Sequence, residues 1–129
     1  MAIPAITLLG KSGSGKTTLM ETLIPELSRR GYRIATIKNH SHPGFKAAQE
    51  GKDSWRHARA GSVHVIIAAP DQIASYRPLK AELNLAEIVQ DVREADLVLV
   101  EGYKQAGYAS LEVLRSEVGC EQCLTMSVW

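Results

Sequence analysis

Residues 10–17 read Gly-Lys-Ser-Gly-Ser-Gly-Lys-Thr and match the phosphate-binding loop pattern G-x-x-x-x-G-K-[ST]. In such a loop the glycine-rich backbone points N–H groups at phosphate oxygens, and the following helix N-terminus adds partial positive charge. Lys16 is placed to reach the β- and γ-phosphates, and the Thr17 hydroxyl is placed to ligate Mg²⁺. A glycine-rich turn without a ligand is the alternative. The expected phosphate-binding residues are Gly10, Lys11, Ser12, Gly13, Ser14, Gly15, Lys16, Thr17 and Thr18.

Lys11 is a second lysine near the start of the loop. Its spacing resembles a variant loop of dimeric nucleotide switches, in which such a lysine reaches the nucleotide of the partner subunit. A solvated loop lysine is the alternative interpretation.

A carboxylate stands at the end of another apolar segment. Residues 97–100 read Leu-Val-Leu-Val and are followed by Glu101 and Gly102. In P-loop proteins an acid at this position holds Mg²⁺ or positions the attacking water, because Mg²⁺ prefers oxygen ligands. Asp53 is a second candidate for Mg²⁺, or else only a helix cap. We therefore expect Lys16, Asp53 and Glu101 as catalytic residues, and Thr17, Asp53 and Glu101 around the metal. Asp96, at the other end of the segment, is expected to be a solvated turn residue.

The segments that must position these residues alternate between strand and helix patterns. Strands are expected at 5–9, 32–38, 63–69, 72–76, 97–100 and, as a possible edge strand, 111–114. Helices are expected at 17–30, from Asp53 or Ser54 to about Ala60, and from Leu85 to about Glu94 behind a capping box. The order predicts an α/β fold of the P-loop NTPase type, a three-layer sandwich whose mainly parallel sheet carries helices on both faces. Ligands bind at the carboxyl ends of such strands.

The 129 residues fit one domain over residues 1–117, with an irregular tail over 118–129. A net charge of +1 gives no electrostatic case for nucleic acid. We expect no membrane span and no secretory signal, because the apolar runs are short and no basic region precedes the first. Cys120 and Cys123 are expected to be reduced thiols of a cytosolic protein.

The segment after the second strand holds residues with two interpretations each. His40 and His42 form either a metal pair or two solvated loop residues. Trp55 either stacks on a base or packs under the loop.

Several of these segments together resemble the molybdopterin-guanine dinucleotide biosynthesis protein B (MobB) family. The most specific are Gly-Lys-Asp-Ser at 51–54 and Glu-Gly-Tyr-Lys at 101–104, and the resemblance spans residues 3–117. The other segments that carry it are 10–18, Thr36-Ile37-Lys38 with the histidines behind it, Ala60-Gly61, and Leu111-Glu112-Val113 with Arg115.

The resemblance implies a dimeric, cytoplasmic protein that binds GTP and Mg²⁺ and has at most slow GTPase activity. Its partners would be a MobA-like nucleotidyltransferase, which joins GMP to molybdopterin, and the molybdopterin cofactor itself. Lys16 and Thr17 would contact phosphate and Mg²⁺, and Asp53 and Glu101 would face the γ-phosphate. Lys104 and Arg115 would lie near the site or the dimer contact.

The chain departs from the family at three places. Lys46-Ala47-Ala48 replaces an acid that the family usually carries near position 48, which leaves hydrolysis open. Ser110 stands where the family usually has a lysine, and residues 118–129 do not resemble the family's C-terminal part.

Other readings remain open from the residues alone, because the guanine-reading N-K-x-D motif is absent and GTP rests on the resemblance. A small-molecule kinase using ATP would place Arg56 and Arg59 in a lid. A nickel-insertion GTPase would use His40 and His42 as ligands. An inactive copy that still binds partners is the last alternative.

Overall fold

The computed structural model describes residues 3–11, 15–40, 52–103, 107–115 and 122–127. The chain divides into two compact units. Unit 1 consists of Met1–Asn39 and Asn84–Trp129, and unit 2 consists of His40–Leu83. Unit 2 therefore begins and ends inside the sequence of unit 1.

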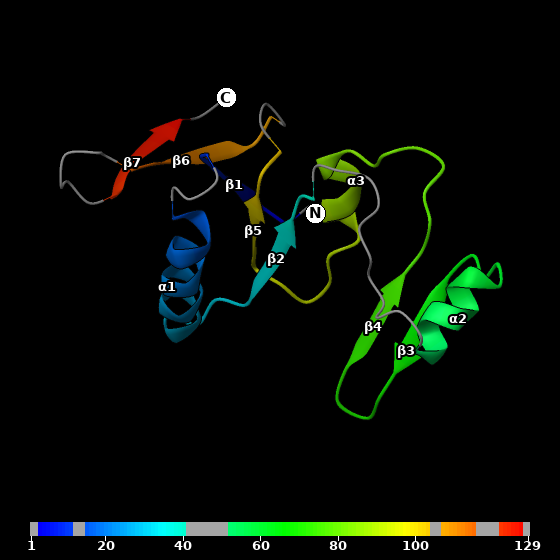
Figure 1. Cartoon of the computed structure of the whole chain (residues 1–129). Coiled ribbons are helices and arrows are strands. Elements are labelled where there is room, and N and C mark those ends of the chain that lie inside the picture. The colour runs from blue at the N-terminus through cyan, green and yellow to red at the C-terminus, as the bar shows by residue number, and fades with distance from the viewer. Residues whose placement is uncertain (1–2, 12–14, 41–51, 104–106, 116–121, 128–129) are drawn as a thin grey trace. The chain divides into compact units, whose positions relative to one another are not determined.

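Unit 1 is built on a five-stranded sheet of order β2-β5-β1-β6-β7 (Figure 1). The β1 strand pairs in parallel with β5 and β6, and β2 pairs in parallel with β5. The last strand, β7, is antiparallel to β6. The strands are β1 (Ala5–Leu9), β2 (Ile34–Lys38), β5 (Leu97–Glu101), β6 (Ala109–Arg115) and β7 (Gln122–Ser127).

Two expectations about the end of the chain are wrong. The strand expected at 111–114 is not an edge, since β6 lies between β1 and β7. The tail expected to be irregular contains β7, whose backbone pairs with β6 from Ser110 to Arg115. The backbone groups along β6 would otherwise form an open edge, and β7 satisfies them.

Helices cover both faces of this sheet, as the fold class predicted. On one face α1 (Lys16–Arg29) packs Met20 against Leu8 and Leu99. On the other face α3 (Leu85–Gln90) packs Leu85 and Val89 against a second cluster. That cluster consists of Ala5, Leu85, Val89, Val98 and Val100. Alternate residues of β1 and β5 thus serve opposite cores, because neighbouring side chains of a strand point to opposite faces.

The helix ends follow local sequence signals. Gly31 follows α1 with φ 94°, as expected for a C′ glycine, and the Tyr32 N–H returns to the Leu27 carbonyl at 3.1 Å. The expected capping box of α3 is confirmed: the Glu87 N–H donates to Asn84 Oδ1 at 2.8 Å, and the Asn84 N–H donates to the Glu87 carboxylate at 3.0 Å. α3 ends at Gln90, earlier than expected.

Unit 2 contains α2 (Asp53–Arg59) and a separate two-stranded antiparallel sheet of β3 (Val65–Ala68) and β4 (Ile73–Tyr76). We expected residues 63–69 to form a buried strand, and this is wrong. Val65 is buried beside α2, but Ile66 is 57% exposed and Ile67 47% exposed. The apolar run pairs with its neighbour in the chain instead of entering the parallel sheet.

Within the part of the chain that the structure describes, none of the helices has the length and apolar character needed to cross a bilayer.

Candidate functional site

Three chain segments meet at the carboxyl edge of the unit 1 sheet. The Gly102 N–H donates to the Leu8 carbonyl at 3.1 Å and joins the end of β5 to β1. The Asn39 N–H donates to the Glu101 carbonyl at 2.9 Å and joins the end of β2 to β5. These bonds fix Glu101 between the segment that leads into the loop and the segment that follows β2.

The site that the sequence predicts at this edge forms around Thr17 and Glu101. The Thr17 hydroxyl lies 3.5 Å from Glu101 Oε1, although the residues are 84 positions apart. Strand alternation explains this: Leu97 and Leu99 pack in the core beneath α1, and Glu101 continues the same face at the end of the strand. A hydroxyl and a carboxylate are hard oxygen donors of the kind that Mg²⁺ prefers, so the pair fits a magnesium ion and its waters.

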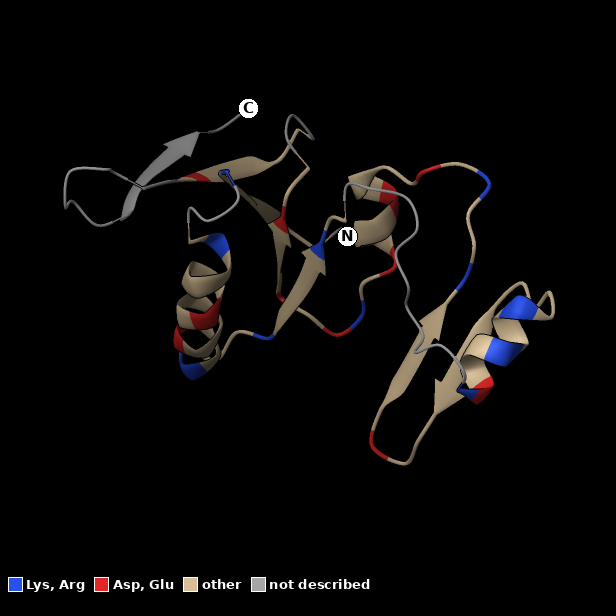
Figure 2. Ribbon diagram, viewed as in Figure 1, with Lys and Arg blue, Asp and Glu red and all other residues tan. Residues whose placement is uncertain are grey.

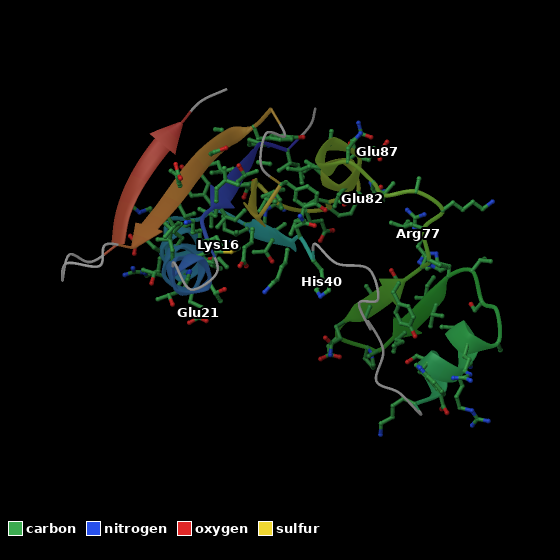
Figure 3. All side chains as sticks on the ribbon, turned by 45° about the horizontal axis from the view of Figure 1, so that its top comes forward. Lys16, Glu21, His40, Arg77, Glu82 and Glu87 are labelled. Carbon is green, nitrogen blue, oxygen red and sulfur yellow. The ribbon has the colours of Figure 1, made fainter. Side chains whose placement is uncertain are left out.

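The described part of the loop has the expected backbone. Gly10 and Gly15 have φ of 158° and 101°. Gly15 is the N-cap of α1 in a left-handed conformation, which favours glycine because a Cβ there would be strained. Lys16 is the first residue of α1. In Figure 3 it is labelled on the side of the helix toward the strands, and Glu21 points away from the sheet. Ser12, Gly13 and Ser14 lie outside the described residues.

Two loop-flanking residues of the predicted set are exposed. Lys11 lies in the described segment ahead of the loop, and Thr18 lies in the first turn of α1, where its carbonyl accepts from the Thr22 hydroxyl at 3.2 Å. Neither has a side-chain contact to Glu101 among the hydrogen bonds of the described residues.

The chain turns sharply after the predicted acid. Gly102 has φ 105° and Tyr103 has φ 60°, so two consecutive residues are left-handed. A Cβ on Gly102 would come within 2.8 Å of the Asn39 Cβ. Such a contact is too close for any real Cβ, and glycine is therefore required here both for backbone angle and for space. The Tyr103 ring packs against the core beneath α3.

Asn39 is a residue at this edge that sequence reasoning missed. It directly follows β2, so its place at the carboxyl end of a parallel strand was the available signal. Its side chain lies against Gly102, with Nδ2 3.5 Å from the position of a Cβ there.

Asp53 is described in unit 2, as the first residue of α2. The N-cap of α2 is Lys52, so the reading of Asp53 or Ser54 as a cap is wrong. The structure brings Thr17 and Glu101 together inside unit 1.

Other residues of the sequence analysis stay outside the described part: His42, residues 46–48, Lys104 and Cys120. The backbones of Arg115 and Cys123 are described in β6 and β7. Among the described residues no three His, Cys, Asp or Glu side chains gather into a metal-binding group.

Two polar contacts of unit 1 were not predicted from the sequence. Asp96 is exposed in a bend, as expected of a solvated turn residue, and it also accepts from the Arg33 backbone N–H at 2.7 Å and pairs with the Arg33 guanidinium at 3.3 Å. These hydrogen bonds lower the pKa of Asp96 and raise the pKa of Arg33. Ser110, noted only as a departure from the family, is buried, and its hydroxyl lies 2.7 Å from that of Thr7. The first contact ties β2 to β5, and the second ties β1 to β6.

Comparison with known proteins decides the family. The model of the family described as molybdopterin guanine dinucleotide synthesis protein B, MobB, matches residues 5–128. The chain belongs to the MobB family. The match extends to residue 128, past residue 117, where the resemblance noted from the sequence ends.

Curated relatives agree with this assignment. The molybdopterin-guanine dinucleotide biosynthesis adapter protein of Haemophilus influenzae is 44% identical over 118 residues, which cover 90% of this chain and 66% of that protein. The Escherichia coli protein of the same name is 36% identical over 121 residues, which cover 91% of this chain and 69% of that protein. The chain thus spans about two thirds of the length of these MobB relatives.

Solved MobB structures share the fold. The crystal structure of Bacillus subtilis MobB superposes with a TM-score of 0.73 at 27% identity, covering 89% of this chain and 70% of that one. A crystal structure of molybdopterin-guanine biosynthesis protein B gives 0.69 at 30% identity, covering 87% and 70%. The mostly parallel sheet with helices on both faces is therefore the MobB arrangement.

Proposed function

We propose that this protein is a GTP-binding adapter in the biosynthesis of molybdopterin guanine dinucleotide, with at most slow GTPase activity. The observation that carries the nucleotide part is the approach of the Thr17 hydroxyl to the Glu101 carboxylate at the end of a parallel strand. The pathway comes from the names of the relatives. The adapter acts beside a MobA-like nucleotidyltransferase and the molybdopterin cofactor, in the cytoplasm.

In this proposal different residues of unit 1 bind the phosphates and the Mg²⁺ ion. Lys16 supplies positive charge to the β- and γ-phosphates from the first turn of α1, and Gly15 gives the backbone its left-handed entry into the helix. Thr17 and Glu101 hold Mg²⁺, with Glu101 acting directly or through a bound water. When bound, Mg²⁺ neutralises the charge that develops on the phosphates. Asp53, the first residue of α2, is the further acid that the resemblance assigns to the γ-phosphate.

Calorimetric titration of GTP and of ATP, each with and without Mg²⁺, tests this proposal. Lys16→Ala should weaken nucleotide binding at least about tenfold, since each lost charge-assisted hydrogen bond costs about 1.5–3 kcal/mol. Thr17→Ala and Glu101→Gln should remove most of the Mg²⁺ dependence and spare metal-free binding. Matched controls on the same helix are Thr22→Ala and Glu21→Gln. Both should behave as wild type, because both side chains are exposed and the Thr22 hydroxyl donates to the Thr18 carbonyl.

Three results would count against the proposal in different ways. Preference for ATP would favour the small-molecule kinase, for which Arg56 and Arg59 remain lid candidates. Stoichiometric nickel in equilibrium dialysis would favour the metallochaperone. Failure of both nucleotides to bind would indicate a copy that keeps only partner contacts.

We also propose that the adapter is a homodimer. In unit 2, Ile66 and Ile73 occupy the same face of the β3–β4 sheet and are 57% and 72% exposed. Apolar surface of this kind on a small sheet is typical of an interface. Light scattering should give twice the chain mass, and Ile73→Glu should shift it toward the monomer. A monomeric mass at high protein concentration would refute the dimer.

A further inference from the structure

The short helix α2 of unit 2 carries cationic and aromatic side chains on one face, and none of them belongs to the P-loop sequence. Lys52 is its N-cap, and Trp55, Arg56 and Arg59 follow at intervals of three and four residues. At about 100° per residue these four side chains fall within an arc of about 100° on one side of the helix. Figure 2 shows the Lys and Arg colour along α2.

The opposite side of α2 explains why this face is free. Ser54 and Ala58 lie across the helix from it and are partly buried, while Lys52, Arg56 and Arg59 are exposed. α2 packs against β3, and Trp55 at the border of the face is partly buried as well. The cationic face therefore points to solvent within unit 2.

The charges on this face lack carboxylate partners. In unit 1, Arg29 and Arg30 both pair with Glu26, and Arg33 pairs with Asp96. Among the described residues no ion pair involves Lys52, Arg56 or Arg59, and even Asp53, three positions before Arg56, forms none with it. Three cations without a carboxylate partner lie within about two turns of helix and repel one another, so an anion bound there relieves that repulsion.

Arg59 and Trp55 add a flat surface to the charge. The Arg59 guanidinium carbon lies 5.2 Å from the centroid of the Trp55 ring, as in a cation–π pair. This contact holds the planar guanidinium over the indole and leaves its N–H edges for an acceptor. Guanidinium groups donate two parallel hydrogen bonds to a phosphate, and aromatic and guanidinium planes stack on heterocyclic bases.

We propose that this α2 face, built from residues outside the P-loop sequence, binds a phosphorylated planar heterocycle of the purine or pterin class. Arg56, Arg59 and Lys52 contact the phosphate, and the Arg59–Trp55 pair carries the ring. The ring class rests on the proposed function, since a pathway to molybdopterin guanine dinucleotide handles both a pterin and a guanine nucleotide. The presence of an anion site with a stacking surface rests on the residues of α2 alone.

The test uses the full chain with two substitutions. Lys16→Ala weakens phosphate binding at the P-loop, and Trp129→Phe leaves Trp55 as the one tryptophan, since the sequence has two. The probes are GMP, guanosine, 6-hydroxymethylpterin phosphate, 6-hydroxymethylpterin and inorganic phosphate. We expect quenching of Trp55 fluorescence by the phosphorylated rings, with affinity at least about tenfold above that of the bare rings or of phosphate alone. Tighter binding of GMP or of the pterin phosphate then identifies the natural ring.

Variants of the face separate a built site from general attraction. Arg56→Glu and Arg59→Glu should each weaken binding at least about tenfold, while Arg56→Lys and Arg59→Lys should weaken it less, because lysine keeps the charge and loses the fork. Arg77→Glu is the matched control: it makes the same charge change on an exposed residue of unit 2 outside α2, labelled in Figure 3, and should leave the affinity unchanged. Trp55→Leu, followed by calorimetry, should remove the preference for phosphorylated rings over phosphate.

The proposal is overturned if no probe binds, if phosphate alone binds as well as the phosphorylated rings, or if Arg77→Glu weakens binding as much as Arg59→Glu. If no probe binds, the cationic face would instead be a contact for an acidic protein surface. These outcomes can be told apart from failure of the proposed function. If the proposed function fails, Lys16→Ala leaves the GTP affinity unchanged in a chain whose α2 is intact.

Discussion

The two units of this chain treat apolar and charged side chains in opposite ways. In unit 1, Val98, Leu99 and Val100 are at most 1% exposed between α1 and α3, and three arginines have carboxylate partners. In unit 2, Ile66 and Ile73 are exposed, and the cations of α2 have no carboxylate partner among the described residues. Unit 1 buries its apolar side chains and pairs these arginines, while unit 2 presents groups that other molecules can satisfy. We therefore expect unit 1 to support the proposed nucleotide site and unit 2 to support contacts with partners and ligands.

The largest test of this contrast compares two core-type residues. Leu99→Ala should lower the free energy of unfolding by about 2–5 kcal/mol, because it leaves a cavity beneath α1. Ile73→Ala should cost less than about 0.5 kcal/mol in the monomer, because its side chain is exposed. Urea denaturation of both variants at several protein concentrations measures this. A large cost for Ile73→Ala that persists in dilute protein would contradict the contrast.

Two glycines with similar backbone angles give a second test of the contrast between the units. Gly102 in unit 1 has φ 105° and meets Asn39, while Gly61 in unit 2 has φ 113° with nothing within 4 Å of a Cβ. Gly61→Ala should cost about 1–2 kcal/mol from the backbone alone. Gly102→Ala should cost more, since Asn39 must move as well, and should also weaken Mg²⁺-dependent nucleotide binding. Equal costs in thermal and urea unfolding would show that the Asn39 contact is not important.

The N-termini of α3 in unit 1 and α2 in unit 2 also differ, because only α3 has a side-chain cap. Asn84→Ala removes a capping box in unit 1 and should cost about 1 kcal/mol. Lys52→Ala should change stability by less than about 0.5 kcal/mol, because the Lys52 side chain makes no cap hydrogen bond to α2. Chemical denaturation of the pair is the measurement, and a stability loss on Lys52→Ala equal to that of Asn84→Ala would argue against our reading of α2.

The smallest effect concerns the Arg33–Asp96 pair. The pKa of Asp96 is lowered in the folded state, so its contribution to stability is present above the unfolded value of about 3.9 and is lost as the pH falls through the folded value. Asp96→Asn should therefore lower Tm slightly at neutral pH and converge with wild type in acid. Asp71→Asn in unit 2, where the carboxylate has no ion pair among the described residues, is the control and should show no such convergence. A Tm difference for Asp96→Asn that does not shrink in acid would refute the pairing.

Much of unit 1 could be predicted from the sequence, because its signals are local. The loop pattern, the apolar strand ending in Glu101 and the capping box at Asn84 each specify a structure within a few residues. The approach of Thr17 to Glu101 followed from a general rule about the carboxyl ends of parallel strands.

The errors occur where the partner of a segment had to be known. The run from Val63 to Ala69 is apolar, but apolarity does not say whether a strand joins a parallel sheet or pairs with its neighbour. The pattern at Asp53 could not show that Lys52 is the cap and Asp53 the first helical residue, since the two are adjacent at the start of α2. The Arg33 partner of Asp96 was not predicted because it lies 63 positions away.

The position of β1 in the middle of the sheet bears on how the chain acquires its shape. Among the described strands the neighbours of β1 are β5 and β6, so β1 meets its sheet partners only after the chain has been synthesised beyond Leu97. On the ribosome the glycine-rich loop after β1 therefore emerges long before the strand end that carries Glu101. Pairing over such long separations is slow, and the exposed nascent strand is prone to wrong contacts. Thr17 and Glu101 accordingly come together late in folding, even though the loop is among the first segments to be made.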